Sequence, residues 1–208
     1  MPKETVVLVH GIYMNGMDMF LLKQRLQNAG YTTCQFSYHS LLSTPAENAL
    51  DLHAYTEKMQ SPVIHYVCHS LGGLVVRHLL NLYRDLKPGR IVTLGTPHTC
   101  SSAAKTLQQF PPGKFILGQS TRQGLEGNVP PLPAGRELGS IAGTMRLGLG
   151  LLIPGIPKPN DGTVAVVETR FDGMKDHIVL PVSHFGMLLS RVVARQVIHF
   201  LEYGFFKH

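Results

Sequence analysis

Cysteine is scarce in this chain, which excludes one class of small cross-linked folds. The 208 residues contain three cysteines, Cys34, Cys68 and Cys100, and their spacing is not that of a metal site. An odd number of widely separated cysteines argues against a disulfide framework, although one pair stays open as an option. Cys68 is most simply interpreted as a small buried apolar residue.

Long hydrophobic runs are also absent, and a helix that crosses a membrane needs about 20 consecutive apolar residues. The amino-terminal sequence MPKETVVLVHG has no long apolar segment bounded by a cleavage site, so it lacks the pattern of a secretion signal. Its apolar run is better explained as a strand of the core. We therefore expect a cytoplasmic protein.

Nucleotide and metal motifs are missing from the sequence as well. The 11 histidines form no HExxH or similar metal-binding spacing, and no phosphate loop occurs. The segment RLGLGLLIPG contains a GxG, but it comes late in the chain and no helical pattern follows it. It is therefore not a dinucleotide-binding fingerprint. We expect no metal and no cofactor.

Charged residues make up 15% of the chain, and 19 Lys and Arg against 13 Asp and Glu give a net charge of +6. The basic residues are scattered, without the basic stripe and interleaved aromatics of a nucleic-acid-binding module. We therefore expect no nucleic-acid partner. The charge is explained by solubility, or by weak attraction to anionic substrates or membrane surfaces.

A length of 208 residues with 44% hydrophobic residues fits one domain, which we place at residues 1–208. Short apolar runs alternate with helical patterns, which predicts an α/β fold: a mostly parallel sheet of about six strands with helices on both faces. The predicted strands are residues 5–9, 32–36, 63–67, 91–94, 137–144 and 178–182.

Among the predicted helices, one has a clear start signal and two have a clear apolar face. One begins at Pro45 and continues over residues 46–59. The other two, with the residues expected to face the core, are 17–28 (Met19, Phe20, Leu22 and Leu26) and 187–202 (Leu189, Val193, Val197 and Phe200).

Between residues 99 and 157 the helix and strand pattern weakens, and Pro and Gly become frequent. A segment this long in a compact domain is usually functional. We predict a lid-like or substrate-binding insertion over residues 99–157. Its apolar part, residues 145–157, is expected to be either a buried connector or an exposed flap that binds an acyl chain.

A predicted strand runs directly into a predicted helix through the turn Cys68-His69-Ser70-Leu71-Gly72. Such a tight corner forces its central residue, Ser70, into an unfavourable backbone conformation, and the glycine removes a Cβ that would block the corner. The hydroxyl would then be exposed at the end of the strand, above a helix N-terminus, as in a nucleophile elbow. The alternative is a serine that only caps the helix.

These motifs resemble the α/β-hydrolase superfamily, and specifically its small bacterial lipases and esterases. The resemblance spans nearly the whole chain, through VVLVHGIYMN, HYVCHSLGGLVVRHL, VTLGTPH, NDGTV and LPVSHFGML. One departure is Cys68, because the family usually has Gly or Ala two residues before the serine. This difference bears on packing below the elbow more than on chemistry.

By this resemblance Ser70 is the nucleophile and His184 the general base. His184 directly follows the last predicted strand, so its loop can reach the edge where Ser70 points, whereas His177 opens that strand at the other end and is interpreted as structural. Asp161, 23 residues before His184 (184 minus 161), is the predicted acid of the triad. Asp172 stays open as the acid, as does the interpretation that NDG only makes a turn.

The resemblance also assigns an oxyanion hole to the backbone N–H groups of Ile12 and Leu71. Gly11 would allow the backbone to approach the substrate closely, and His10 is interpreted as a structural histidine that supports this loop. Five nearby residues are candidates for lining the pocket: Tyr13, Met14, Cys68, His69 and His98.

Together these features predict a serine hydrolase, an esterase or lipase, that cleaves carboxylic esters through an acyl-enzyme. Its partner would be a small-molecule acyl ester or a lipid, the latter with transient contact to a membrane surface. A thioesterase, amidase or acyltransferase would use the same triad. A non-catalytic ligand-binding module on the same scaffold is the alternative from another class.

Overall fold

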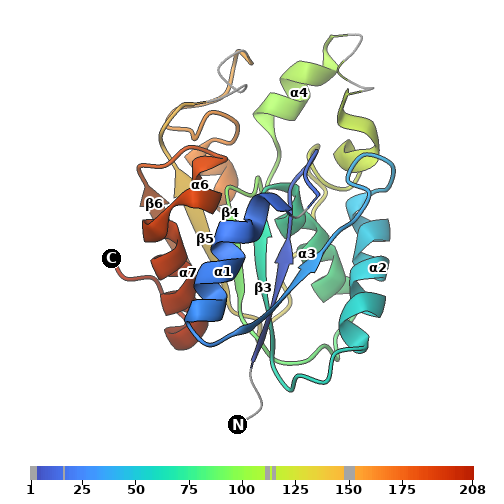
Figure 1. Cartoon of the computed structure of the whole chain (residues 1–208). Helices are drawn as coiled ribbons and strands as arrows, with labels where there is room; N and C mark the ends of the chain where they lie inside the picture. The colour runs from blue at the N-terminus through green and yellow to red at the C-terminus, as the bar shows by residue number, and fades with distance from the viewer. Residues whose placement is uncertain (1–3, 16, 111–112, 114–115, 148–152) are drawn as a thin grey trace.

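The structure is a computed structural model of the chain, and it describes residues 4–15, 17–110, 113, 116–147 and 153–208. A six-stranded sheet forms its centre, with the strand order β2-β1-β3-β4-β5-β6 (Figure 1). Every strand pairs in parallel with its neighbours. The strands are β1 (Thr5–Val9), β2 (Thr32–Phe36), β3 (Ile64–His69), β4 (Ile91–Leu94), β5 (Leu138–Gly143) and β6 (Asp176–Leu180). The predicted α/β architecture is therefore confirmed.

Three strands differ from their predicted bounds. β5 is one residue shorter at each end, and the larger differences in β3 and β6 have a physical cause. β3 continues beyond Val67 because its last two residues pair with Thr93 and Leu94 of β4. β6 begins and ends two residues earlier than predicted. It stops before Pro181, whose nitrogen has no hydrogen to donate to a neighbouring strand.

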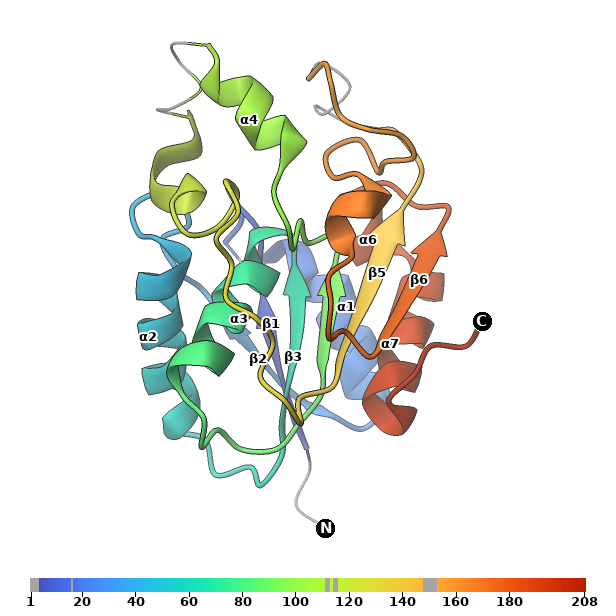
Figure 2. The ribbon, with the colours of Figure 1, turned by 180° about the vertical axis from the view of Figure 1, so that it is seen from behind.

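Helices cover both faces of the sheet, as predicted (Figures 1 and 2). One face carries α1 (Phe20–Asn28), α6 (Gly186–Leu189) and α7 (Arg191–Tyr203), and the other carries α2 (Pro45–Glu57) and α3 (Leu71–Leu82). Alternate strand residues point to opposite faces, so Val6 of β1 packs in the first layer and Val7 in the second. Because both layers are apolar, the central strands are nearly continuous hydrophobic runs.

The helix predicted to begin at Pro45 begins there. The Thr44 hydroxyl accepts a hydrogen bond from the Glu47 N–H (3.2 Å), and the Glu47 carboxylate accepts one from the Thr44 N–H (2.7 Å). This reciprocal cap satisfies two backbone donors at the start of α2. The shorter helices are η1 (Met17–Met19), α4 (Ser102–Gln108), η2 (Gly118–Thr121) and η4 (Val166–Thr169).

Two apolar residues predicted to face the core are exposed instead. Phe20 is 58% exposed, because the buried stripe of α1 runs through Leu22 and Leu26. Leu189 is 47% exposed, because the predicted last helix is in fact two helices. Ser190 is extended and its side chain caps α7, so the buried face of α7 starts in a new register after it.

β5 divides the predicted insertion at residues 99–157 into two connections. Residues 95–137 join β4 to β5 and residues 144–175 join β5 to β6. Parts of both connections lie beyond the carboxyl ends of the strands (Figures 1 and 2). A lid-like role for this region, and a single domain over residues 1–208, stay predictions.

The apolar segment at residues 145–157 is neither wholly buried nor wholly exposed. Leu147 is exposed, whereas Ile156 is buried and packs with Ala103 at the start of α4. Residues 148–152 lie outside the described part of the chain. The segment thus begins at the surface, near Leu147, and ends in an apolar cluster, near Ile156.

The order of the strands reverses at β1. The first connection leads from β1 to β2 on one side, and the chain then crosses to β3 on the other. In parallel α/β sheets, ligands bind beyond the carboxyl ends of the strands at such a reversal. The loop that begins at His10 follows β1 and Ser70 follows β3, so both predicted motifs lie at this point.

The three cysteines are free thiols. Cys68 is fully buried in the apolar layer between the sheet and helices α2 and α3, in agreement with its interpretation as a small apolar residue. No helix in the described ranges is both long and apolar enough to cross a membrane.

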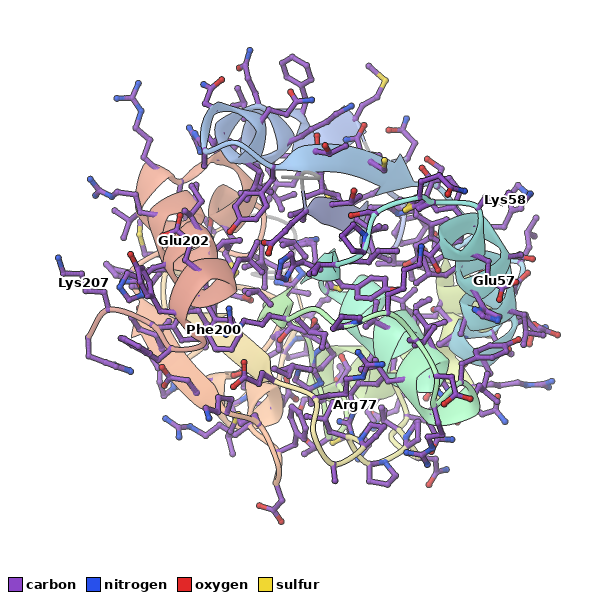
Figure 3. The ribbon with its side chains drawn as sticks, turned by 90° about the horizontal axis from the view of Figure 1, so that it is seen from below. Glu57, Lys58, Arg77, Phe200, Glu202 and Lys207 are labelled. Atoms are coloured by element: carbon purple, nitrogen blue, oxygen red, sulfur yellow. The ribbon has the colours of Figure 1, made fainter. Side chains whose placement is uncertain are left out.

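Phe200 lies on the side of α7 that faces the centre of the molecule (Figure 3), and it packs onto β5 where that strand has no side chain. A Cβ on Gly139 would lie 2.5 Å from Phe200 Cε2 and 2.7 Å from Phe206 Cζ. Both aromatic side chains are fully buried, with ring centroids 4.9 Å apart. Gly139 therefore sets how closely α7 approaches the sheet.

We expect Gly139→Ala to lower the free energy of unfolding by about 1 to 3 kcal/mol, because the added methyl group overpacks the layer between β5 and α7. Urea denaturation measures the loss. Adding Phe200→Leu makes room for the methyl group, so the double variant should be more stable than the sum of the two single losses predicts. Strictly additive losses would contradict this account of the packing.

Candidate active site

Ser70 stands at the turn between β3 and α3, in the strained conformation predicted for it. Its φ and ψ angles are 50° and −120°, a combination that is sparsely populated by non-glycine residues and costs on the order of 1 to 3 kcal/mol. A Cβ on Gly72 would clash with the Val9 carbonyl of β1, so glycine is required where α3 begins this close to the sheet. Ser70 remains 7% exposed and lines a cavity.

Hydrogen bonds to the neighbouring strand and its loop hold this turn. The Ser70 N–H donates to the Leu94 carbonyl (2.9 Å), and the Ser70 carbonyl accepts from the Thr96 hydroxyl (2.8 Å). Thr96 is fully buried, so its hydroxyl is committed to this contact. Sequence analysis did not identify Thr96, and the available signal was its place in the VTLGTPH motif.

Asp161 and His184 are brought together by two hydrogen bonds. Asp161 Oδ2 accepts from His184 Nδ1 at 2.7 Å, and the Asp161 carbonyl accepts from the His184 N–H at 2.9 Å. Asp161 Oδ1 accepts from the N–H groups of Thr163 (2.9 Å) and Val164 (2.7 Å), and the Asp161 side chain is fully buried. With Nδ1 donating to the carboxylate, Nε2 of a neutral His184 carries the lone pair that a general base needs.

The two alternatives considered from the sequence lie elsewhere. His177 is near the amino end of β6, where its Nε2 contacts the Thr169 hydroxyl at 2.9 Å. Burial, and then the charge of Arg170, lower the pKa of His177 to about 4. Asp172 is exposed in a turn that precedes β6. Neither of the two contacts His184.

Ser70 and the Asp161–His184 pair lie at the same edge of the sheet. The Ser70 N–H binds the Leu94 carbonyl, and a Cβ on the next residue, Gly95, would lie 2.9 Å from His184 Nδ1 and 3.0 Å from Asp161 Oδ2. Within the described residues, the Ser70 hydroxyl and His184 Nε2 form no hydrogen bond. Such bonds are often loose without substrate and tighten only in the reacting complex.

Among the described residues, no acceptor is found for the N–H groups of the two predicted oxyanion donors. Leu71 is the first residue of α3, so its N–H has no acceptor within the helix, and no acceptor is found for Ile12 N–H among the residues that the structure describes. Both residues line the same cavity as Ser70. Two unpaired N–H groups beside a serine hydroxyl form the kind of site that stabilises a developing oxyanion.

His10 supports the loop that carries Ile12, as interpreted from the sequence. It is fully buried, its Nδ1 contacts the Gly11 carbonyl at 2.8 Å, and its Nε2 accepts from the Tyr38 N–H at 3.3 Å. The Tyr38 hydroxyl donates to the His10 carbonyl (2.8 Å), and the two rings stack with centroids 4.3 Å apart. Burial lowers the pKa of His10, which keeps this residue neutral.

An apolar cavity of about 420 Å³ opens beside Ser70. Its wall combines the loop after β1, the elbow, α4, the region around η2 and the residues after Asp161, and none of the described residues that line it is charged. Of the five candidates from the sequence, only Tyr13 is in this wall. A second hollow, of about 620 Å³, is larger than this cavity. Arg90 and Glu137 are among its lining residues, so it lies at the amino ends of β4 and β5, away from Ser70.

The helix α4 in this wall is fastened to the rest of the molecule. The Ser102 N–H donates to Glu168 Oε1 (2.7 Å), and the Ser101 N–H donates to the Leu125 carbonyl (2.8 Å). Sequence analysis missed these contacts and the apolar side chains of the wall, because they lie in the region without a regular pattern. In the described ranges, no group of three or more His, Cys, Asp or Glu residues could hold a metal ion.

No curated protein matches this chain. Among solved structures, the chain is similar to the Bacillus licheniformis lipase BlEst2 in its mature form, with 20% identity, a TM-score of 0.67, and coverage of 90% of this chain and 86% of the lipase. It is similar to the metagenomic carboxyl esterase MGS0156, with 18% identity, a TM-score of 0.70, and coverage of 88% of this chain and 65% of the esterase.

A third similar structure is an extracellular α/β-hydrolase from a Paenibacillus species, with 14% identity, a TM-score of 0.61, and coverage of 94% of this chain and 97% of the hydrolase. At such identities the similarity shows the fold alone. A family described as a domain of unknown function, DUF7379, matches residues 2–108. The chain therefore has the α/β-hydrolase fold and belongs to the family DUF7379.

Proposed function

We propose that this protein is a serine hydrolase that cleaves carboxylic esters with an uncharged, apolar acyl group. The observation that carries the proposal is the hydrogen bond between buried Asp161 and partly buried His184, at the same edge of the sheet as a strained serine that opens into an uncharged cavity. A serine that only capped α3 would use its side chain for that purpose. Ser70 makes no side-chain capping hydrogen bond, which supports a chemical role.

In the proposed first step, Ser70 Oγ attacks the carbonyl carbon of the ester while His184 Nε2 takes the hydroxyl proton. The carbonyl oxygen becomes an oxyanion and accepts hydrogen bonds from the N–H groups of Ile12 and Leu71. The intermediate then collapses, the alcohol leaves with the proton held by His184, and the acyl group stays on Ser70. Asp161 holds the imidazole in the correct tautomer and stabilises its charged form.

In the proposed second step, water replaces the alcohol. His184 takes a proton from the water molecule as its oxygen attacks the acyl carbon, and the same N–H groups stabilise the second oxyanion. Collapse breaks the bond to Ser70 Oγ, which regains its proton from His184, and a carboxylic acid leaves. No metal or other cofactor takes part in either step.

The cavity supports the proposed acyl specificity. Its size, about 420 Å³, lies in the range of small-molecule pockets, and its apolar lining favours a hydrocarbon chain. A charged acyl group would lose its hydration there without gaining a partner. A lipase, a carboxyl esterase and a thioesterase are all among the structures with this fold, so matched substrates are needed to distinguish esters from thioesters and amides.

We expect a fluorophosphonate probe to label Ser70, because the probe reacts with serines activated by a neighbouring base. Mass spectrometry of the labelled peptide locates the adduct. Ser70→Ala should abolish labelling and ester hydrolysis, and His184→Ala should reduce both about 10³-fold or more. An adduct on Ser101, which lines the same cavity, would contradict the assignment.

Asp161→Asn should lower kcat by about 10² to 10⁴-fold, because an amide does not stabilise the required His184 tautomer or its charged form. Asp172→Asn is the matched control. Asp172 is exposed and makes no contact with His184, so its variant should stay within about twofold of the wild type. Steady-state hydrolysis of one p-nitrophenyl ester measures both, and equal effects of the two substitutions would count against Asp161.

With p-nitrophenyl esters of increasing acyl length, kcat/KM should rise by up to about fourfold per added methylene until the cavity is filled, since burying one CH₂ is worth about 0.8 kcal/mol. Leu107→Ala widens the wall on α4 and should move the optimum to a longer chain. Leu82→Ala, at the exposed end of α3, is the control. A profile that does not depend on chain length would rule out the cavity as the acyl site, and matched thioesters and amides test the preference for esters.

A further inference from the structure

His69 directly precedes Ser70 and contacts the loop of His184. It is 2% exposed, its Nε2 lies 3.0 Å from the His184 carbonyl oxygen, and the centroids of the two rings are 4.6 Å apart. The two residues are 115 positions apart in the sequence. This contact therefore joins the end of β3, where Ser70 stands, to the loop after β6.

The hydrogen bond fixes the protonation of the His69 ring. A carbonyl oxygen only accepts, so Nε2 must carry the hydrogen. Nδ1 of a neutral ring is then unprotonated, and within the described residues it is a buried atom without a hydrogen-bond partner. His69 therefore has one polar contact, and that contact is to the backbone of His184.

The backbone of His184 is held at both of its polar atoms. The N–H donates to the Asp161 carbonyl (2.9 Å), and the carbonyl accepts from His69 (3.0 Å). The side chain adds the bond from Nδ1 to Asp161 (2.7 Å). Asp161 thus fixes one side of the residue, and His69 alone fixes the carbonyl side among the described residues.

We propose that His69 is a positioning residue: its Nε2–H group holds the His184 carbonyl and so sets the imidazole within reach of the Ser70 hydroxyl. This inference rests on the proposed function, in which His184 is the general base. A displacement of about 1 Å at a reacting group can cost on the order of 100-fold in rate. His69 makes no contact with substrate in this proposal and takes no proton.

The environment of His69 suits a neutral donor. Burial, and then the nearby charge of His184, lower the pKa of His69 to about 3. The hydrogen bond to the His184 backbone and the charge of Asp161 raise this pKa by less, and His10 lowers it slightly. The ring therefore stays neutral when His184 takes the serine proton. A Lys or Arg donor would instead place a second positive charge beside the imidazolium and oppose its formation.

The test compares His69→Phe, which keeps a ring without a donor, with His69→Gln, which keeps an N–H donor at similar reach. Rates are divided by the number of active sites titrated with the fluorophosphonate probe. We expect His69→Phe to lower kcat about 10- to 100-fold with KM changed less than about twofold, and to slow probe labelling in parallel. His69→Gln should recover most of that loss.

The pH dependence separates positioning from proton transfer. Because His69 is neutral in the working range, the acid limb of kcat/KM against pH should stay where it is in His69→Phe. A shifted limb, an unchanged kcat per active site, or a Gln variant as slow as the Phe variant would overturn the proposal. ¹⁵N NMR of the wild type adds a test that does not depend on folding of the variants. A His69 ring that is protonated at pH 6, or that carries its hydrogen on Nδ1, would also overturn the proposal.

These outcomes are distinct from a failure of the proposed function. If Ser70→Ala keeps full activity, the proposed function fails, and the role of His69 fails with it. If Ser70 is labelled and His184→Ala is inactive, but His69→Phe keeps the wild-type kcat, only the positioning role fails.

Discussion

The close approach of helix α3 to strand β1 is the constraint on which the site depends. Gly72, the second residue of the helix, lies directly against the Val9 carbonyl, so the chain must turn at Ser70 within one residue and adopt the strained φ of 50°. The hydrogen bonds from the Ser70 N–H to the Leu94 carbonyl and from the Thr96 hydroxyl to the Ser70 carbonyl oppose this strain. The same corner leaves the Leu71 N–H without an acceptor among the described residues and directs the start of the helix toward the cavity.

The strands and the candidate triad could be predicted from the sequence because their signals are local. Apolar runs such as residues 5–9 mark strands that are buried on both faces, and a parallel sheet gathers the residues that follow each strand at one edge. Ser70 and His184 could therefore be expected at the same edge. Phe20 and Leu189 were wrongly placed because apolar character alone does not show where a helix begins or which stripe faces the sheet.

The side chains that line the cavity could not be predicted, because they come from segments without a regular helix or strand period. Leu71 from the elbow, Leu107 from α4 and Leu125 from the long connection meet only in the folded chain. Their positions depend on single contacts, such as the bond from the Ser102 N–H to Glu168. Nothing in the sequence around Ser102 or around Glu168 indicates that they pair. In one fold, contacts of this kind can change the shape of a cavity while the catalytic residues are retained.

Two neighbouring histidines of the site are given different chemistry by their partners. Nδ1 of His184 donates to a carboxylate, which stabilises the ring when it gains a proton, whereas Nε2 of His69 donates to a carbonyl in a fully desolvated position. Only the first arrangement suits proton transfer, and the second suits a fixed, uncharged support. Because His69 is the residue before Ser70 and contacts the His184 carbonyl, a shift in the elbow would also move His184, which ties the position of the candidate nucleophile to that of the candidate base.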